Sequence, residues 1–455
     1  MERIKNNFLL EKNFFKTVFA IVLPIAAQNV ISFGVNVMDS VMLGSLGDVA
    51  ISAANLGGQP FFLLMGFGFG LSSGGSVLIA QYWGKKDMAR IRKVMSLSMK
   101  FVFVMAVLFT LVCTLMPSAV MRLFTPDLEI VTAAASYLQL AALAYLPYSI
   151  SNNYIMSLRA VEQVKISAAI YGVSFFVNVF FNYGFIFGKF GFPALGVRGA
   201  AVGTVLARCT ELLLALLYMY FGEKRVHFRL RHVMEFDKEL LPDYIRHSLP
   251  VVGNELLWSF GVTVISAILG HLGSVYVTAN SIASVANQLA LVFVAGVANA
   301  AAVLTGKTIG EGNRERTRKV ANTLLFMAVC IGCISCVLLL LGRAPFLSLY
   351  KVSQQAYDAA WHILTVVALV QLCAGYEITC VVGVLRGGGD TRTSFIIDCG
   401  CQWLIGIPLA LFAGFVMGWP AHLVYLCMRM ESPAKAICCA LRIHSGKWVR
   451  KVTLD

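Results

Sequence analysis

The sequence has few charged residues for its length. Of its 455 residues, only 13% are Asp, Glu, Lys or Arg, whereas 58% are apolar. A soluble globular chain has about 25% charged residues, so this composition does not supply the surface of a soluble enzyme. Intrinsic disorder is excluded too, because a disordered chain needs low hydrophobicity. The composition predicts an integral membrane protein.

Sequence motifs for catalysis and cofactor binding are also lacking. Gly387-Gly388-Gly389 follows an apolar run and has no Walker lysine. The glycines of Gly66-Phe-Gly-Phe-Gly70 lie inside an apolar run, where they favour close helix packing. Most of the 12 cysteines lie in similar runs. No metal-ligand spacing and no Ser/His/Asp arrangement stands out, so we expect neither an enzyme nor a cofactor.

Apolar runs long enough to span a bilayer recur along the whole chain. About 20 residues span the hydrocarbon core as a helix. The sequence therefore predicts twelve transmembrane helices, at about 17–43, 50–82, 94–117, 130–157, 166–188, 195–221, 247–270, 276–305, 320–342, 357–384, 394–417 and 419–441. Pro24 and Pro250 lie inside the first and seventh runs, where each removes a backbone hydrogen bond and can hinge the helix.

The basic residues that give the net charge of +14 lie mainly on one side of the predicted helices. Twenty-eight Lys and Arg residues fall in the termini and loops on one side, and five fall on the other. This bias predicts cytoplasmic termini in a cell membrane. Basic residues in short loops also favour contact with anionic lipid over nucleic acid. We therefore expect the lipid bilayer as a partner and no nucleic acid.

The sequence repeats itself at an offset of 226–227 residues. Leu23-Pro24 returns as Leu249-Pro250, and Ser45-Leu46-Gly47 returns as His271-Leu272-Gly273. The turn 84–93 and Leu158-Arg159-Ala160 also have counterparts, at 310–319 and 385–387. The offset spans six helices, so the two halves keep the same orientation, as in parallel-repeat transporters. We expect an all-α protein with two six-helix lobes, 1–221 and 247–455, and a cytoplasmic linker at 222–246.

Several ordered motifs resemble those of the multidrug and toxic compound extrusion (MATE) transporters, in particular the NorM-like bacterial branch. They are Leu23-Pro24, 38–44 (MDSVMLG), 178–182 (NVFFN), 186–188 (IFG), 196–204 (GVRGAAVGT), 385–391 (LRGGGDT) and 445–448 (SGKW). The resemblance implies a secondary antiporter that exports organic cations and other drugs, by exchange with Na⁺ or H⁺ and by alternating access. We expect small cationic or aromatic substrates and a monomeric protein.

Asp39 is the first candidate coupling residue. It lies in the first predicted helix, about five residues from Gly44 at the outer end. Ionisable groups are costly inside a membrane, so each is a candidate functional site. The resemblance implies a protonatable carboxylate that controls the bend at Pro24. A carboxylate held only by Asn36 or Ser40 is the structural alternative.

Glu255 and Glu377 are the candidates in the second half. Each lies about eight residues from a cytoplasmic helix end, at a depth of roughly 12 Å. Two nearby carboxylates can share a proton or attract a cation, so Na⁺ at Glu255 and Glu377 and H⁺ both remain open. Glu255 matches the glutamate of the sodium-coupled branch, whereas the second acid of that branch falls nearer Gly375.

Polar residues of the fifth and sixth helices complete the candidate set. Asn178, Asn182 and Thr204 match a cluster that supports Asp39 in the proton-coupled branch, where the position of Asn182 is an aspartate. Hydrogen bonding between helices is the alternative role. Two further sets of opposite charges, Arg208 with Glu211 and Glu431 with Lys435, are spaced for structural ion pairs.

Two other functions remain open. A lipid-linked oligosaccharide flippase of the same superfamily needs several basic residues in its cavity, and the deep charges here are mainly acidic. A channel is disfavoured by the two Leu-Pro hinges and by acids that lack counterparts in the repeat. The sequence therefore favours an antiporter for cations.

Overall fold

The computed structural model describes residues 8–9, 11–350 and 352–453 and contains helices but no strand in these ranges. Arg3, Lys5 and Lys351, which contribute to the charge bias, lie outside them. In chain order the helices are α2 (Lys12–Gly44), α3 (Asp48–Gly57), α4 (Gln59–Lys85), α5 (Met88–Leu115), α6 (Pro117–Arg122), α7 (Leu128–Ala141), α8 (Tyr145–Ala160), α9 (Lys165–Phe187), α10 (Val197–Leu217), α11 (Leu230–Val233), α12 (Leu240–Leu272), α13 (Ser274–Gly310), α14 (Arg314–Leu347), α15 (Gln354–Ile378), α16 (Thr391–Cys401), α17 (Ile407–Leu411), α18 (Ala421–Arg429) and α19 (Glu431–His444).

Five shorter helical segments extend or join these helices. One is a 3₁₀ turn, and four have the wider π-helical winding. They are η1 (Ala142–Ala144), η2 (Tyr218–Gly222), η3 (Thr379–Leu385), η4 (Gln402–Gly406) and η5 (Phe412–Val416). Single π-helical turns inside α-helices are frequent at functional sites. Here η3 lies between the candidate Glu377 and the buried Arg386.

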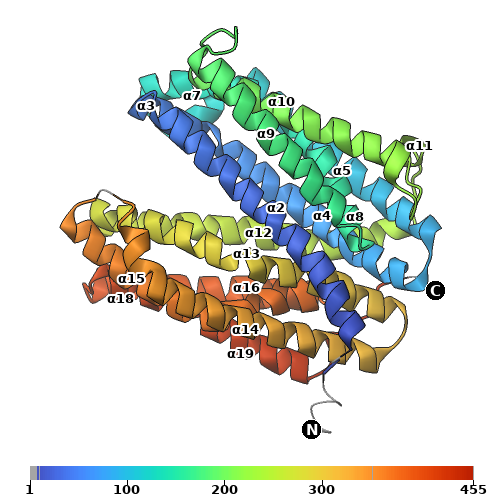
Figure 1. The fold of residues 1–455 in the computed structure, drawn as a ribbon. Coiled ribbons are helices and arrows are strands. Elements are labelled where there is room, and N and C mark those ends of the chain that lie inside the picture. Colours follow the sequence, from blue (N-terminus) through green and yellow to red (C-terminus); the bar gives the residue numbers. More distant parts are fainter. Residues whose placement is uncertain (1–7, 10, 351, 454–455) are drawn as a thin grey trace. The chain divides into compact units, whose positions relative to one another are not determined.

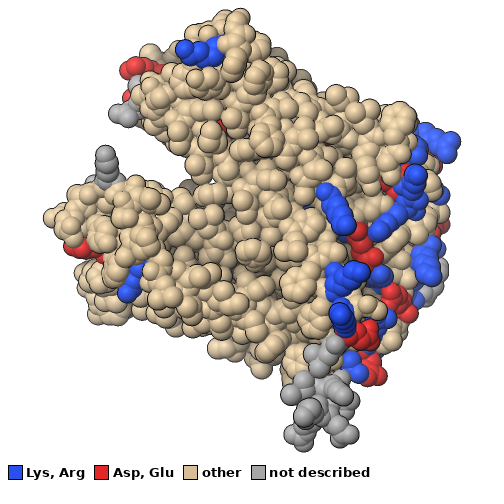
Figure 2. All heavy atoms as spheres, in the orientation of Figure 1, with Lys and Arg blue, Asp and Glu red and all other residues tan. Residues whose placement is uncertain are grey.

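Eleven helical stretches in the described ranges are long and apolar enough to cross a membrane, at the first eleven predicted positions. The prediction of one continuous helix at 419–441 is wrong, because α18 ends at Arg429 and α19 begins at Glu431. Pro433 has no backbone N–H to donate to the Arg429 carbonyl, which explains the interruption. On the face shown in Figure 2, charged side chains gather in a few patches and wide surfaces carry none.

The chain divides into two compact units. The C-terminal unit comprises Met1–Ala26, Ala80–Lys86 and Gly253–Asp455, and the N-terminal unit comprises Ala27–Ile79 and Asp87–Val252. Within the C-terminal unit α14 and α15 pack side by side, as do α9 and α10 within the N-terminal unit (Figure 1). Each unit has its own apolar core, centred on α13 and α15 in one and on α7 in the other.

The repeat is visible in local backbone structure. Helices α2 and α12 are both 33 residues long and both contain an internal proline. Gly47 and Gly273 follow them with φ of 105° and 132°, which only glycine adopts readily. Asp87 and Asn313, also 226 positions apart, each cap the next helix by accepting a hydrogen bond from the third backbone N–H of that helix. The repeat predicted from the sequence is therefore present in turns and caps.

The segment predicted as a linker is folded against α5. The Ser96 hydroxyl donates a hydrogen bond of 2.6 Å to the Glu235 carbonyl, and Lys93 forms an ion pair of 2.9 Å with Asp237. Glu223 is 1% exposed and accepts hydrogen bonds from the backbone N–H groups of Val226 and Phe228. These contacts all lie within the N-terminal unit, so most of the segment is ordered.

Candidate functional site

In the N-terminal unit, Asp39 is bound by an asparagine of α9. The Asn182 side-chain amide donates hydrogen bonds to Asp39 Oδ1 at 2.6 Å and to Asn178 Oδ1 at 3.2 Å. Asn178 and Asn182 are one helical turn apart, so both face the same side of α9. Asp39 is half-buried, whereas the two asparagines are buried. The structure therefore brings three of the predicted residues together.

The close approach of α10 fixes this group. A side chain at position 203 would collide with the Asn182 side chain. Because Gly203 has no side chain, α10 can pack directly against Asn182. Thr204, the next residue, is half-buried and forms no hydrogen bond with Asp39, Asn178 or Asn182. The alternative partners of Asp39 are not used either, since Ser40 donates to the Asn36 carbonyl. Asn182 Oδ1 is buried and has no hydrogen-bond partner.

The pair Arg208 and Glu211 forms the predicted ion pair in α10. Their closest atoms, Arg208 Nη1 and Glu211 Oε1, are 2.5 Å apart. Ser174 donates a further hydrogen bond of 2.9 Å to Glu211, and the Arg208 guanidinium lies 4.9 Å from the centre of the Tyr148 ring. A buried charge needs such compensation. These contacts compensate the charges of Arg208 and Glu211, which is consistent with a structural role for the pair.

In the C-terminal unit, Glu255 of α12 pairs with a buried arginine. Arg386, which follows η3, places Nη2 3.0 Å from Glu255 Oε1. The Arg386 side chain is 2% exposed, and that of Glu255 is 18% exposed. Arg386 lies beyond the end of the predicted helix 357–384, so the sequence does not predict its contact with Glu255.

Glu377 belongs to a second set of contacts, which we call the Lys435 network and which comprises Asn254, Glu377, Asp398, Glu431, Ser432 and Lys435. Lys435 Nζ lies 2.7 Å from Asp398 Oδ1 and 3.5 Å from Glu431 Oε2. Asn254 donates to Asp398 Oδ2 at 2.8 Å, and Ser432 donates to Glu377 Oε1 at 3.2 Å. The predicted pair Glu431–Lys435 is present, but the nearer partner of Lys435 is Asp398.

Asp398 is a candidate site residue that sequence analysis missed. It is the only Asp, Glu, Lys, Arg or His in the predicted helix 394–417, and an intramembrane acid marks a candidate site. Glu255 and Glu377 are held by different partners, Arg386 and Ser432. The two sites adjoin along the chain, because Asn254, which precedes Glu255, and Ser432, which binds Glu377, both belong to the Lys435 network. Within the described residues no three His, Cys, Asp or Glu side chains are grouped to hold a metal ion.

The C-terminal segment closes over the glycine turn 387–389. Asp390 has no exposed surface and pairs with Arg442 at 2.6 Å and Arg450 at 3.1 Å. Trp448 is 1% exposed, and the Arg450 N–H donates to the Gly388 carbonyl at 2.9 Å. The motifs 385–391 and 445–448 are thus two sides of one packed structure.

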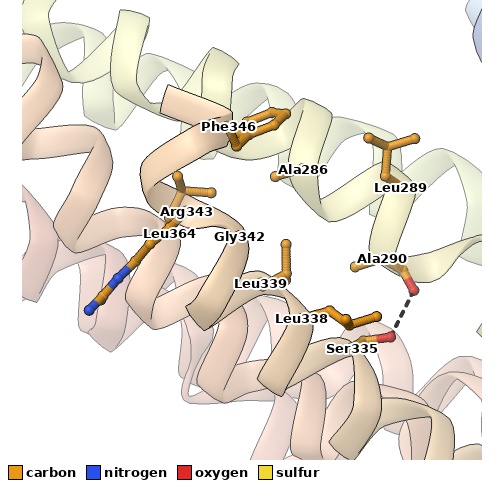
Figure 3. Close-up of a pocket in the computed structure, with 10 residues that line it drawn as sticks. All are labelled: Ala286, Leu289, Ala290, Ser335, Leu338, Leu339, Gly342, Arg343, Phe346 and Leu364. Atoms are coloured by element: carbon orange, nitrogen blue, oxygen red, sulfur yellow. Dashed lines mark hydrogen bonds between the residues drawn. The ribbon is translucent and has the colours of Figure 1, made fainter. Parts of the chain in front are cut away.

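An apolar pocket lies in the C-terminal unit between α13, α14 and α15 (Figure 3). Its volume is about 260 Å³, below the roughly 300–1,000 Å³ of pockets that hold drug-sized ligands. Ser335 donates to the Ala290 carbonyl at 3.3 Å, and the Arg343 side chain points away from the pocket. The Arg343 guanidinium lies 4.0 Å from the centre of the Trp361 ring. None of the predicted site residues lines this pocket.

Comparison with known proteins gives the family. The MatE family model matches residues 24–184 and again residues 250–412, so its two matches begin 226 residues apart, at Pro24 and Pro250. The chain belongs to the MatE family. This confirms the predicted family and the parallel repeat.

Relatives of this MatE chain are multidrug resistance proteins. "Probable multidrug resistance protein NorM" of Thermotoga maritima is 27% identical, covering 96% of this chain and 94% of the relative. "Multidrug resistance protein MdtK" of Yersinia enterocolitica is 25% identical, covering 96% of each. MATE proteins are transporters rather than enzymes. The chain is therefore a transmembrane transporter with multidrug efflux relatives, as predicted.

Solved MATE structures share the fold. The "Crystal structure of MATE in the straight conformation" matches with a TM-score of 0.87 and 19% identity, covering 95% of this chain and 96% of that chain. A MOP superfamily transporter from Pyrococcus furiosus, described as having "reverse polarity of binding pocket", matches with a TM-score of 0.86 and 19% identity over the same shares. Both show that the chain shares the fold of these transporters.

Proposed function

We propose that this MATE protein exports organic cations and other small aromatic drugs across the cell membrane in exchange for Na⁺ or H⁺. The observation that supports this best is Asp39, a half-buried carboxylate in the first span that accepts a hydrogen bond of 2.6 Å from Asn182. A carboxylate in this position can hold either an incoming ion or a cationic substrate, but its single charge does not satisfy both. Exchange follows from this competition.

The Asn182 amide suits a carboxylate that changes its protonation state. Its nitrogen donates to ionised Asp39, while its oxygen is buried without a partner. A protonated carboxyl group has an O–H that needs an acceptor, while its carbonyl oxygen still accepts. Rotation of the amide by half a turn would present the oxygen to protonated Asp39. The same residue would then serve both states without moving α9.

We propose the remaining roles on the same basis. Glu255 and Glu377 couple ion movement in the second lobe, and Pro24 and Pro250 act as hinges for alternating access. Lobes 1–221 and 247–455 are joined by 222–246, which lies in the cytoplasm with both termini, and the protein works as a monomer. The 28-to-5 distribution of basic residues supports this orientation. Labelling of a single cysteine in 222–246 by an impermeant reagent outside intact cells would contradict it.

The experiment is export of a fluorescent organic cation from proteoliposomes under an imposed pH or Na⁺ gradient. We expect gradient-driven export by the wild type and none by Asp39→Asn, which keeps the size of the side chain. Glu129→Gln, which removes an exposed acid, is the matched control and should export normally. Normal export by a well-folded Asp39→Asn protein would place coupling elsewhere. Ion-channel currents in place of saturable exchange would reject the antiporter.

A further inference from the structure

The Lys435 network carries a positive charge of its own inside the C-terminal unit. The Lys435 side chain is 4% exposed, and its ammonium group contacts the carboxylates of Asp398 and Glu431 at 2.7 Å and 3.5 Å. A buried ammonium group requires such partners, because burial removes its water. Lys435 therefore occupies the place among these oxygens that a bound cation would need.

The nearby carboxylate oxygens are also largely committed. Asp398 uses Oδ1 for Lys435 and Oδ2 for the Asn254 amide. Glu255 pairs with the Arg386 guanidinium, whose side chain is 2% exposed. Two fixed cations thus compensate three of the four acids in this region. The fourth, Glu377, accepts a hydrogen bond from Ser432, which follows Glu431 in α19.

These residues do not fit a sodium ion. Hard cations are bound by several oxygen ligands, whose negative charge replaces the lost hydration. Here the Lys435 ammonium and the Arg386 guanidinium already occupy oxygens of three of these carboxylates, and both groups repel an entering cation. A proton has different requirements, because it bonds to one carboxylate oxygen and needs no shell of ligands.

We propose that Lys435 is a resident cation that replaces Na⁺ in the C-terminal unit and thereby sets the ion specificity of this unit, which binds no Na⁺. Exchange of a proton through Glu377 then follows, and it rests on the proposed antiport. The absence of Na⁺ binding in the C-terminal unit does not depend on transport.

The test is binding of radiolabelled Na⁺ to the purified full-length protein, together with thermal unfolding in NaCl or choline chloride at equal ionic strength. For the wild type we expect that Na⁺ binding and the Tm difference between the two salts are the same as in Glu377→Gln and in Asp398→Asn, because the C-terminal unit contributes no Na⁺ site. Saturable Na⁺ binding by the wild type that Glu377→Gln or Asp398→Asn abolishes would overturn the proposal.

Two variants test the role of Lys435 itself. Lys435→Gln leaves Asp398 and Glu431 without their cation, so Na⁺ should now bind and raise Tm by several degrees relative to choline, since a ligand of the folded state stabilises it. Lys435→Arg keeps the charge and should show no Na⁺ effect. The double variant Lys435→Gln/Asp398→Asn removes both charges of the closer pair and should lose most of the gained effect.

The outcomes separate this inference from the proposed function. A folded Lys435→Gln protein that ignores Na⁺ would overturn the replacement of Na⁺ by Lys435, and recovery of this variant only in NaCl would support it. If Lys435→Gln folds in neither salt, the measurement of Na⁺ binding to the wild type decides whether the proposal stands. Export by the wild type that is driven by Na⁺ and lost in Glu377→Gln would overturn the inference and leave antiport intact. Failure of export under every gradient would reject antiport alone.

Discussion

Pro24 and Pro250 hold equivalent places relative to the two compact units. Each lies two residues before the last residue of a unit segment, Ala26 in α2 and Val252 in α12, after which the same helix continues in the other unit. A proline inside a helix removes one backbone hydrogen bond and introduces a kink. The two positions at which a long helix changes units are therefore the positions where its hydrogen bonding is weakest.

Replacement of either proline should slow transport without unfolding the protein. Pro24→Ala and Pro250→Ala restore the missing hydrogen bond, so each should stiffen its helix and lower the export rate several-fold. The measurement is initial export from proteoliposomes with thermal unfolding in parallel. Pro117→Ala is the control, because Pro117 starts α6, where a proline costs no hydrogen bond. Unchanged rates in both variants would show that neither proline is a hinge.

Removal of the Asn182 amide should impair export through Asp39. A hydrogen bond to a charged group contributes about 1.5–3 kcal/mol, which corresponds to a factor of about 10 or more in rate if it acts in the rate-limiting step. We expect Asn182→Ala to lower export by this factor at neutral pH. Asn178→Ala removes a residue that contacts Asn182 but not Asp39 and should have a smaller effect. Equal effects of the two would point to helix packing as their role.

Glu255 and Glu377 should behave as parts of one network. Glu255→Gln and Glu377→Gln should each impair coupling, and the double variant should be little worse than either single variant, because Asn254, Asp398 and Lys435 connect their surroundings. Independent sites give additive changes in free energy. A double-mutant cycle on gradient-driven export measures the difference. Additive losses would mean two separate sites.

Acid should weaken the attachment of the segment 222–246 to α5. The hydrogen bond from Lys93 holds the pKa of Asp237 below its usual value. A lowered folded-state pKa stabilises the protein above the unfolded value of about 3.9, and this stabilisation is lost as the pH falls through the folded-state pKa.

The pair is partly exposed, with 43% of the Lys93 side chain accessible, so its contribution is at most about 1 kcal/mol. Thermal unfolding from pH 7 to pH 3 should therefore show a slightly smaller acid loss in Asp237→Asn than in the wild type. Glu239→Gln, an exposed neighbour, should follow the wild-type curve. If Asp237→Asn loses as much stability between pH 7 and pH 3 as the wild type, the Lys93–Asp237 pair does not contribute to stability.

Trp448 should be needed for stability of the C-terminal unit. It is 1% exposed against the turn at Gly388, and truncation of a buried tryptophan costs about 3–5 kcal/mol. We expect a clearly lower Tm for Trp448→Ala and no change for Lys447→Ala, whose side chain is exposed. A wild-type Tm for Trp448→Ala would mean that the C-terminal segment does not pack against the turn at Gly388.

The helices could be predicted because their apolar runs have the length that a bilayer demands, and the repeat because it retains prolines, turns and caps. The hydropathy pattern alone misses the division at Met430, which the missing N–H of Pro433 explains. Asp39, Asn178 and Asn182 could be grouped from motifs. The partners of Glu255 and Glu377 could not, because Arg386 and Lys435 reach them across the fold from other helices.

The π-helical segment η3 fixes the direction in which Arg386 points. Each residue turns an α-helix by about 100°, so loss of one residue between Thr379 and Leu385 would rotate everything after it by that angle relative to Glu377. Arg386 would then face away from Glu255, while Glu377 would keep its place beside Ser432. The wide turn thus sets the angle between two contacts of this helix, that of Glu377 with Ser432 and that of Arg386 with Glu255.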